Sequence, residues 1–390
     1  MRTLREFNVK NKRVLVRCDF NVPLDKKGEI QDDFKILQTI PTIKYLIDNE
    51  AKIILLSHLG RPKGEVIEEL RLNLVAERLS KILVRPIKKL DDCIGKEIEK
   101  EIEKMQPKEV ILLENIQFNP GERMNDPGFT KSLASYADIF ILEAFGQSHR
   151  DYASISGLPK YLPSGAGFSL EKEVKILSKV LGKPWRPLVI IIGGVKIETK
   201  IKMIKQFLEK ADHLLIGGKI ANAILIAKGI CVIGPWPEKK IVEEIEKLSL
   251  TSTKLHLPID AIVSPDKTGK VYTRMSGPGK VRNDELLLDI GPETINVFSQ
   301  VIKKAKMIVW SGPLGFFENP LFEKGTKEIA QIITRNHKAY KIVGGGDTLF
   351  AVSKFGFTEK FDHVSTGGGA MLSFLSGEEL PGLKALERQF

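Results

Sequence analysis

Two glycine triplets near the end of the chain could hold phosphate groups. Gly344-Gly345-Gly346 follows an apolar run and precedes Asp347 and Thr348, and Gly367-Gly368-Gly369 follows a second short apolar run. Glycines let backbone N–H groups approach a bulky anion, and a helix that begins behind them favours negative charge. A carboxylate at position 347 could also bind a magnesium ion carried by the phosphates. The pattern predicts two backbone anion sites, with Asp347 as a metal ligand.

Arginine and histidine residues recur where short apolar runs end in the first half of the chain. The segments are Arg17-Cys18-Asp19-Phe20-Asn21, Ser57-His58-Leu59-Gly60-Arg61 and Ser148-His149-Arg150. A planar guanidinium binds phosphate or carboxylate through two parallel hydrogen bonds. We therefore expect Arg17, Arg61 and Arg150 to form a pocket for a small anion of high charge. Neither His58 nor His149 has a Ser or Cys nucleophile pattern nearby, so a hydrolytic triad finds no support.

The second half of the chain carries the parts that a nucleotide site needs. These are Gly193-Gly194, Lys196, Lys200, Gly217-Gly218, Ser311-Gly312-Pro313 and Glu318. A nucleotide requires an apolar slot for its base, hydroxyl contacts for its ribose, and cations with amides for its phosphates. Neither the Walker loop nor the GxGxxG fingerprint is present. We expect Trp310 to pack in the core.

The elements that must position these residues alternate between short strands and amphipathic helices. The predicted strands are Arg13–Cys18, Lys52–Ser57, Val110–Leu113, Ile139–Leu142, Leu188–Ile192, His213–Ile216, Met307–Trp310, Lys341–Val343 and His363–Thr366. This alternation predicts an α/β chain with two doubly wound parallel-sheet (Rossmann-like) lobes. We expect a lobe at 1–168, a hinge helix at 169–183, a lobe at 184–371 and a C-terminal segment at 372–390. Ser164-Gly165-Ala166-Gly167 is a further candidate hinge.

Composition limits the classes of protein that fit. The net charge is +11, with 60 Lys and Arg against 49 Asp and Glu. Because lysines and glutamates are mixed along the chain, we favour a solvated surface and a basic cleft over nucleic-acid binding. No apolar run is long enough to span a bilayer, and no signal peptide is evident, so we expect a cytoplasmic protein without membrane contact. The three widely spaced cysteines fit a reducing compartment.

In this order, the motifs resemble those of the phosphoglycerate kinase family. The matching blocks are Arg17 to Pro23, Ser57 to Pro62, Gly193 to Lys196, Asp289 to Glu293, Gly344 to Thr348 and Ser365 to Ala370. The resemblance implies an ATP-dependent kinase of glycolysis and gluconeogenesis. It would transfer a phosphoryl group reversibly between 1,3-bisphosphoglycerate and ADP, giving 3-phosphoglycerate and ATP. The family also implies Mg²⁺ with ATP or ADP and closure of the two lobes. We expect a monomer, with a homodimer as the alternative.

The resemblance also assigns residues to roles. The catalytic set is Lys35, Lys196, Gly346 and Gly369. The triose-binding set is Asp19, Phe20, Asn21, Lys35, His58, Leu59, Gly60, Arg61, Gln117, His149 and Arg150. The nucleotide-binding set is Gly194, Lys200, Gly217, Gly218, Ser311, Gly312, Pro313, Glu318, Gly345, Gly346, Asp347 and Thr348, with Asp347 also the metal ligand.

Four positions depart from the pattern of the family. Lys35 and Gln117 stand where arginines are usual, Leu142-Glu143 replaces an Asn-Asp pair, and Ser311 replaces an asparagine. Lysine keeps the charge of arginine but loses its fork geometry. We expect an active kinase with a rearranged phosphate clamp. The alternatives are a nucleotide-binding homologue with altered or lost triose specificity, and another phosphotransferase of the same fold.

Overall fold

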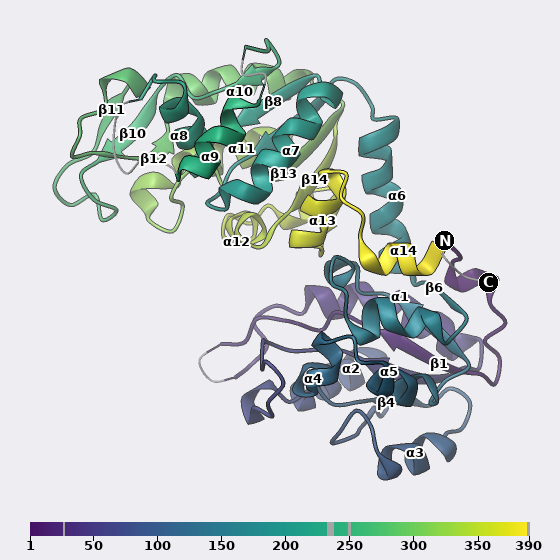
Figure 1. Cartoon of the computed structure of the whole chain (residues 1–390). Coiled ribbons are helices and arrows are strands. Elements are labelled where there is room, and N and C mark those ends of the chain that lie inside the picture. Colours follow the sequence, from purple (N-terminus) through teal and green to yellow (C-terminus); the bar gives the residue numbers. More distant parts are fainter. Residues whose placement is uncertain (26–27, 232–237, 249–250, 388–390) are drawn as a thin grey trace. The chain divides into compact units, whose positions relative to one another are not determined.

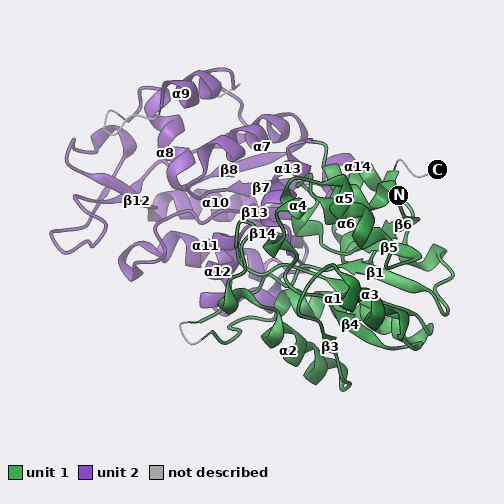
Figure 2. Cartoon of the chain, turned by 60° about the horizontal axis from the view of Figure 1, so that its bottom comes forward, with its two compact units in different colours: residues 1–176, 379–390 green, residues 177–378 purple. Residues whose placement is uncertain are grey.

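A computed structural model describes residues 1–25, 28–231, 238–248 and 251–387. The chain divides into two compact units (Figure 2). Unit 1 consists of Met1–Ile176 with Glu379–Phe390, and unit 2 of Leu177–Glu378. We describe each unit separately.

Unit 1 contains a six-stranded parallel sheet in the order β3-β4-β2-β1-β5-β6. Figure 1 labels β1, β4 and β6 of this sheet. Its strands are β1 (Arg13–Arg17), β2 (Lys52–Leu56), β3 (Lys88–Lys89), β4 (Val110–Leu112), β5 (Ile139–Leu142) and β6 (Ser164–Ala166). The central strands are continuous apolar runs whose residues are almost all buried, as expected for parallel strands covered on both faces. The sheet therefore brings the carboxyl ends of β4, β2, β1 and β5 to one edge.

Helices separate these strands in the chain. They are α1 (Phe34–Asp48), α2 (Asn73–Leu83), α3 (Lys96–Glu103), α4 (Pro120–Arg123), α5 (Pro127–Ala134) and α6 (Phe168–Gly182), with α14 (Pro381–Glu387) from the C-terminal segment. Short helical turns are η1 (Leu4–Glu6), η2 (Glu68–Leu70), η3 (Ile116–Phe118), η4 (Phe145–Gln147), η5 (Ala153–Gly157) and η6 (Leu158–Lys160). Helix α6 begins in unit 1 and ends in unit 2.

The C-terminal segment is bound to unit 1 through the loop that follows β5. Gly382 N–H donates to the carbonyl oxygen of Ser148 at 2.9 Å. A Cβ at position 382 would lie 2.9 Å from Cγ2 of Ile155 in η5, so glycine permits this close packing. Helix α14 thus supports the segment that leads to His149 and Arg150.

Unit 2 contains a second six-stranded parallel sheet in the order β15-β14-β13-β7-β8-β9 (Figure 1). Its strands are β7 (Leu188–Ile192), β8 (His213–Ile216), β9 (Leu255–His256), β13 (Met307–Ser311), β14 (Tyr340–Gly344) and β15 (His363–Ser365). Its helices are α7 (Ile197–Lys210), α8 (Gly218–Ala227), α9 (Lys239–Glu246), α10 (Pro292–Lys304), α11 (Lys324–Arg335), α12 (Gly346–Lys354) and α13 (Gly368–Leu375), with turns η7 (Pro278–Lys280), η8 (Pro320–Phe322) and η9 (Thr358–Lys360). Trp310 is fully buried in the core of this unit, as expected.

A small antiparallel sheet in unit 2 was not predicted. Its order is β11-β10-β12, formed by β10 (Ala261–Ser264), β11 (Arg274–Ser276) and β12 (Leu286–Ile290). The short, partly polar β11 lacks a clear alternation of buried and exposed side chains, and a register shift interrupts the β10–β12 pairing. Both features weaken a period-two pattern.

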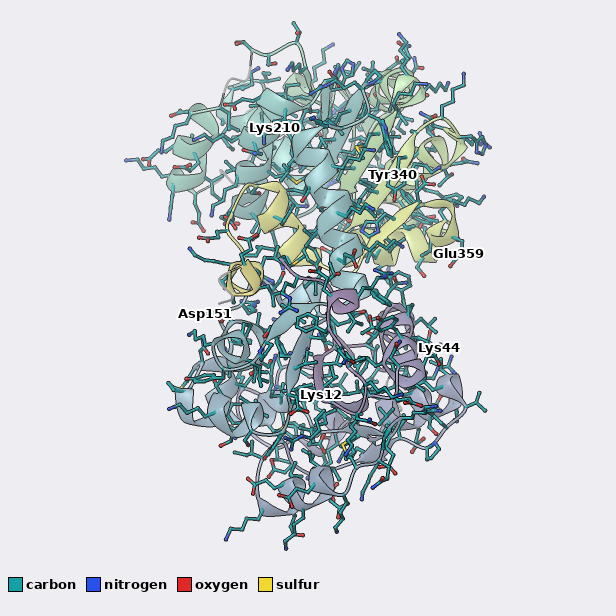
Figure 3. All side chains as sticks on the ribbon, turned by 90° about the vertical axis from the view of Figure 1, so that its right-hand side faces the viewer. Lys12, Lys44, Asp151, Lys210, Tyr340 and Glu359 are labelled. Carbon is teal, nitrogen blue, oxygen red and sulfur yellow. The ribbon has the colours of Figure 1, made fainter. Side chains whose placement is uncertain are left out.

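The prediction of an α/β chain with two parallel sheets is confirmed, and every predicted strand is present within a few residues. The segment Ser164–Ala166 is instead strand β6, paired with β5, and so is not the free hinge that its glycines suggested. Charged side chains such as Lys44, Asp151, Lys210 and Glu359 project from the ribbons of both units (Figure 3). Among the described residues, no helix is long and apolar enough to cross a bilayer.

Candidate functional site

In unit 1, the predicted triose residues follow four adjacent strands. Strands β1 and β5 are neighbours in the sheet although they are distant in sequence, so the chain reverses its winding between them. Ligands of open α/β sheets bind beyond the carboxyl ends of strands at such a point. The structure therefore brings the loops after β1, β2, β4 and β5 to one edge.

Lys35 and Asp19 form an ion pair at this edge. Nζ of Lys35, in the first turn of α1, lies 3.1 Å from Oδ2 of Asp19. Burial acts to raise the pKa of Asp19, but the charge and hydrogen bond of Lys35 outweigh it and hold the pKa below its usual value. Nearby, Oδ1 of Asn21 accepts the N–H of Gly60 at 2.9 Å. These contacts join the loop after β1 to the loop after β2.

The prediction that Arg17 lines the anion pocket is wrong. Its side chain is fully buried, and its Nε donates to Oγ of Ser154 at 2.7 Å. Arg61 and Arg150 are both exposed, and neither forms an ion pair with a described residue. Two arginines rather than three are therefore free to bind an anion.

Other predicted triose residues contribute in different ways. Phe20 and Leu59 are core residues, so only their backbone could reach a ligand. Gln117 is buried in η3, where its carbonyl oxygen accepts Gly64 N–H at 3.1 Å. His149 is half-buried in the loop after β5.

Glu143, one of the four departures, stabilises the start of α6. Its carboxylate is buried and accepts hydrogen bonds from Thr42 Oγ1 at 2.9 Å and from Ser169 N–H at 3.1 Å. A negative charge near a helix N-terminus is favourable. Burial nevertheless raises the pKa of Glu143 to about 8. Gly167 leaves no room for a Cβ because the carboxylate occupies that position.

In unit 2, glycines allow the turns after β7, β8 and β13 to approach one another. Gly194 N–H donates to the carbonyl oxygen of Pro313 at 2.7 Å, and Gly218 N–H donates to that of Leu314 at 3.0 Å. A Cβ on Gly193 would overlap the Pro313 carbonyl. These amides are therefore already paired within the protein, and the glycines of the first two turns shape the site rather than bind phosphate directly.

Buried polar groups in unit 2, here called the polar centre, connect α7, the end of β13 and α12. Nζ of Lys200, which is buried, donates to Oγ of Ser311 at 2.7 Å and to its carbonyl oxygen at 3.1 Å. Oγ1 of Thr348 accepts Gly312 N–H at 2.6 Å. Desolvation lowers the pKa of Lys200 to about 7, although the charge of Asp347 opposes this effect. An anionic ligand would favour the charged form of Lys200.

A cavity of about 310 Å³ lies beside this centre in unit 2. Five predicted residues line it: Gly194, Gly218, Pro313, Glu318 and Asp347. The other predicted nucleotide residues, with Lys196 and Gly369, do not line it. Lys196, Gly346 and Gly369 are exposed at helix starts, where unpaired N–H groups and the helix dipole favour an anion.

The cavity also has walls that the sequence prediction missed. They come from the turn after β7, from α8, and from the small antiparallel sheet with its flanking loops: Val195, Lys219, Asn222, Pro258, Ala261, Lys267, Leu287, Leu288, Asp289 and Ile290. Leu314, Gly315 and Phe316, which lie between the predicted residues Pro313 and Glu318, complete the lining. The sequence did contain one sign of this wall. The block from Asp289 to Glu293 matched the family motifs, but none of its residues was assigned to a binding site. Asp289 is buried and accepts Gly325 N–H at 2.7 Å, and burial raises its pKa to about 7.

The described residues contain no group of three or more acidic, histidine or cysteine side chains that could hold a metal ion. Asp347 is a single exposed carboxylate at the start of α12. Mg²⁺ at nucleotide sites typically takes only one or two carboxylates, with phosphates and water as its other ligands. Asp347 therefore fits an ion that arrives with a nucleotide.

Comparison with known proteins identifies the family of the chain. The family model for phosphoglycerate kinase matches residues 4–378. Phosphoglycerate kinases of Dictyoglomus turgidum and Moorella thermoacetica are 48% and 44% identical to the chain, each over 98% of both sequences. The phosphoglycerate kinase structure from Coxiella burnetii has a TM-score of 0.86 at 37% identity, and that from Pyrococcus horikoshii has 0.85 at 30%. Both cover 99% of this chain and 98% of their own. The chain therefore belongs to the phosphoglycerate kinase family.

Proposed function

We propose that this chain transfers a phosphoryl group reversibly between 1,3-bisphosphoglycerate and ADP, giving 3-phosphoglycerate and ATP. Family membership over nearly the whole chain carries this proposal. The structural support is that unit 1 presents Arg61 and Arg150 as exposed cations and unit 2 contains a largely apolar cavity beside a glycine turn. Each unit thus has the chemistry of one half of the reaction.

In the proposed triose half, Arg61 and Arg150 bind the phosphate of the triose. Asp19, Asn21 and His58 orient its polar groups. Lys35, already at 3.1 Å from Asp19, is close enough to this set to contribute charge to the transferring group. A single guanidinium donates two parallel hydrogen bonds to a phosphate, which a lysine ammonium group cannot do. Lys35 therefore supplies charge without the second hydrogen bond of an arginine.

In the proposed nucleotide half, the base occupies the cavity between Gly218 and Leu314, and Glu318 contacts the ribose. The phosphates lie along the turn from Gly345 to Thr348 and reach Lys200. Asp347 would bind the Mg²⁺ of the nucleotide, which neutralises phosphate charge when bound.

The residues of this chain act by positioning and by stabilising charge. The acceptor in the ATP-consuming direction is a carboxylate that is already ionised, so no general base is required. Lys196 stabilises the phosphoryl group as it transfers, and the N–H groups at the starts of α12 and α13 add to this effect. Productive transfer requires closure of the two units, which also excludes water.

We further propose a cytoplasmic monomer, with a homodimer as the alternative. All three cysteines are buried and none forms a disulfide bond, which fits a reducing compartment. Sedimentation at several protein concentrations distinguishes monomer from dimer.

Separate calorimetric titrations with 3-phosphoglycerate and MgADP test the assignment of the two halves. Arg61→Ala should weaken 3-phosphoglycerate binding at least tenfold and leave MgADP binding unchanged, because one charge-assisted pair is lost. Arg85→Ala is the matched control, since Arg85 bonds the Lys108 carbonyl before β4 and lies away from the proposed pocket. Binding of MgADP without saturable binding of 3-phosphoglycerate would favour the nucleotide-binding alternative.

A further inference from the structure

A buried chain of hydrogen bonds lies below the proposed triose pocket in unit 1. Arg17, at the end of β1, has no exposed side-chain surface. Its Nε donates to Oγ of Ser154 at 2.7 Å, and that hydroxyl donates to Oε1 of Glu122 at 2.6 Å. Glu122 also accepts Ser154 N–H at 2.9 Å, while Nη1 of Arg17 donates to the Cys18 carbonyl. The guanidinium is therefore fixed from two sides.

The third side of the guanidinium determines which nitrogen of His58 carries the proton. Nη2 of Arg17 lies 3.4 Å from Nδ1 of His58. A guanidinium has donors only, so Nδ1 must accept this hydrogen bond and cannot be protonated. The ring proton is then on Nε2. His58 is only 2% exposed, but Nε2 has no partner among the described residues and keeps contact with solvent.

The groups that face His58 keep its ring neutral. They are Arg17 from β1, Asp19 from the following loop, Lys35 from α1 and Arg61 from the loop after β2. Three of these are cations and one is an anion. Burial, followed by the charge of Arg17, lowers the pKa of His58 to about 3. Protonation would place a second positive charge against a buried guanidinium.

We propose that Arg17 is a positioning residue that fixes His58 as its neutral Nε2–H tautomer, so that His58 meets the triose as a hydrogen-bond donor and not as a cation. Arg17 itself is fully buried and does not touch the substrate. Among the residues that the structure describes, Arg61, Arg150 and Lys35 then supply the positive charge at the triose site. The substrate named here rests on the proposed function, whereas the tautomer is a property of the free protein.

Nitrogen-15 NMR of the histidine rings tests the tautomer without any ligand. In the wild type, the His58 signals should show the Nε2–H pattern and stay constant from pH 5 to pH 8. Arg17→Lys keeps a buried cation beside Glu122 but loses the fork that reaches both Ser154 and His58. This variant should lose the tautomer signature and bind 3-phosphoglycerate about tenfold more weakly, as expected for one such hydrogen bond, with MgADP affinity unchanged.

Arg13→Lys is the matched control, because Arg13 lies on the same strand and faces Asp138 instead. It should change neither the NMR signature nor triose affinity. A purely structural role of the buried charge predicts that Arg17→Lys leaves the His58 signals unchanged, and that result would overturn the inference.

A pair of His58 variants covers the case in which Arg17→Lys does not fold. Glutamine places an amide nitrogen near the position of Nε2, and asparagine places one near Nδ1. His58→Gln should therefore retain more 3-phosphoglycerate affinity than His58→Asn, and the opposite order would contradict the proposal. A wild-type ring protonated on Nδ1, or on both nitrogens at pH 7, would also reject it. A confirmed tautomer in a protein that does not bind 3-phosphoglycerate would instead reject the proposed function.

Discussion

The candidate sites of the two units are built from different parts of the polypeptide. In unit 1, charged side chains form the candidate site and other buried side chains hold them, as Ser154 and Glu122 hold Arg17. In unit 2, paired backbone groups shape the cavity, as Gly194 and Pro313 do, although five ionisable side chains also line it. A site made of side chains can change one residue at a time. A site shaped by backbone approach depends on glycines that no other residue can replace.

This difference explains where the departures from the family pattern lie. Lys35, Gln117 and Glu143 belong to unit 1, where a substituted side chain can be compensated by its neighbours. The one departure in unit 2, Ser311, accepts hydrogen bonds from Lys200 through both its hydroxyl and its carbonyl oxygen. The comparison therefore predicts that substitutions in unit 1 adjust affinity, whereas glycine substitutions in unit 2 disrupt the fold of the site.

The largest effect should come from Lys196→Ala, the most direct test of a side chain in unit 2. Lys196 is exposed at the N-cap of α7 and forms no ion pair with a described residue. Removing its charge should lower turnover about 10³-fold or more while leaving MgADP affinity within about twofold, since it acts on the transferring group. Steady-state kinetics and calorimetry measure the two quantities. Retained turnover would remove Lys196 from the catalytic set.

Gly312→Ala tests the dependence of unit 2 on its backbone. Gly312 has φ +101°, and a Cβ there would overlap the carbonyl of Gly193. We expect a loss of about 3 kcal/mol in unfolding free energy, together with weaker nucleotide binding. Gly346→Ala is the control, because a Cβ there meets nothing within 4 Å and the amide remains. Equal losses in the two variants, measured by denaturant unfolding, would contradict the backbone account.

Glu143→Gln tests the buried network of unit 1. Because burial raises the pKa of Glu143 from 4.5 to about 8, the folded protein keeps a proton that the unfolded chain releases between these values. Stability from this group is therefore present below pH 4.5 and is lost as the pH rises towards 8. Removing the titration should abolish this loss, which amounts to roughly 2.5 kcal/mol of unfolding free energy between pH 5 and pH 7. Identical pH profiles of unfolding free energy in both proteins would reject the assignment.

Gln117→Arg should have the smallest effect and restores a charge that the family usually carries. We expect 3-phosphoglycerate affinity to rise about tenfold, as one added charge-assisted hydrogen bond would give, with MgADP affinity unchanged. Gln106→Arg adds the same charge at an exposed position of unit 1 and should have no effect. A calorimetric titration that shows no gain would mean that another cation already occupies the position of the missing guanidinium.

The sequence predicted the parallel sheets and their loops because buried strands are continuous apolar runs and parallel strands share one functional edge. It also predicted that a helix begins at the glycine turn before Asp347 and Thr348, and the structure has α12 there. It could not show that Arg17 is buried, because a strand-end arginine has the same local pattern whether it faces solvent or Glu122. The sequence prediction missed the apolar wall from β10 and β12. These strands are short, and they form a wall only when they pair with strands from other parts of the chain.

The most direct test is a coupled assay of ATP-dependent turnover of 3-phosphoglycerate by the wild-type protein, because it requires both half-sites at once. We expect turnover that saturates in both substrates, with a KM for 3-phosphoglycerate that falls in Gln117→Arg while the KM for ATP stays constant. Normal MgADP binding without turnover of 3-phosphoglycerate would contradict the claim that the two units form one kinase.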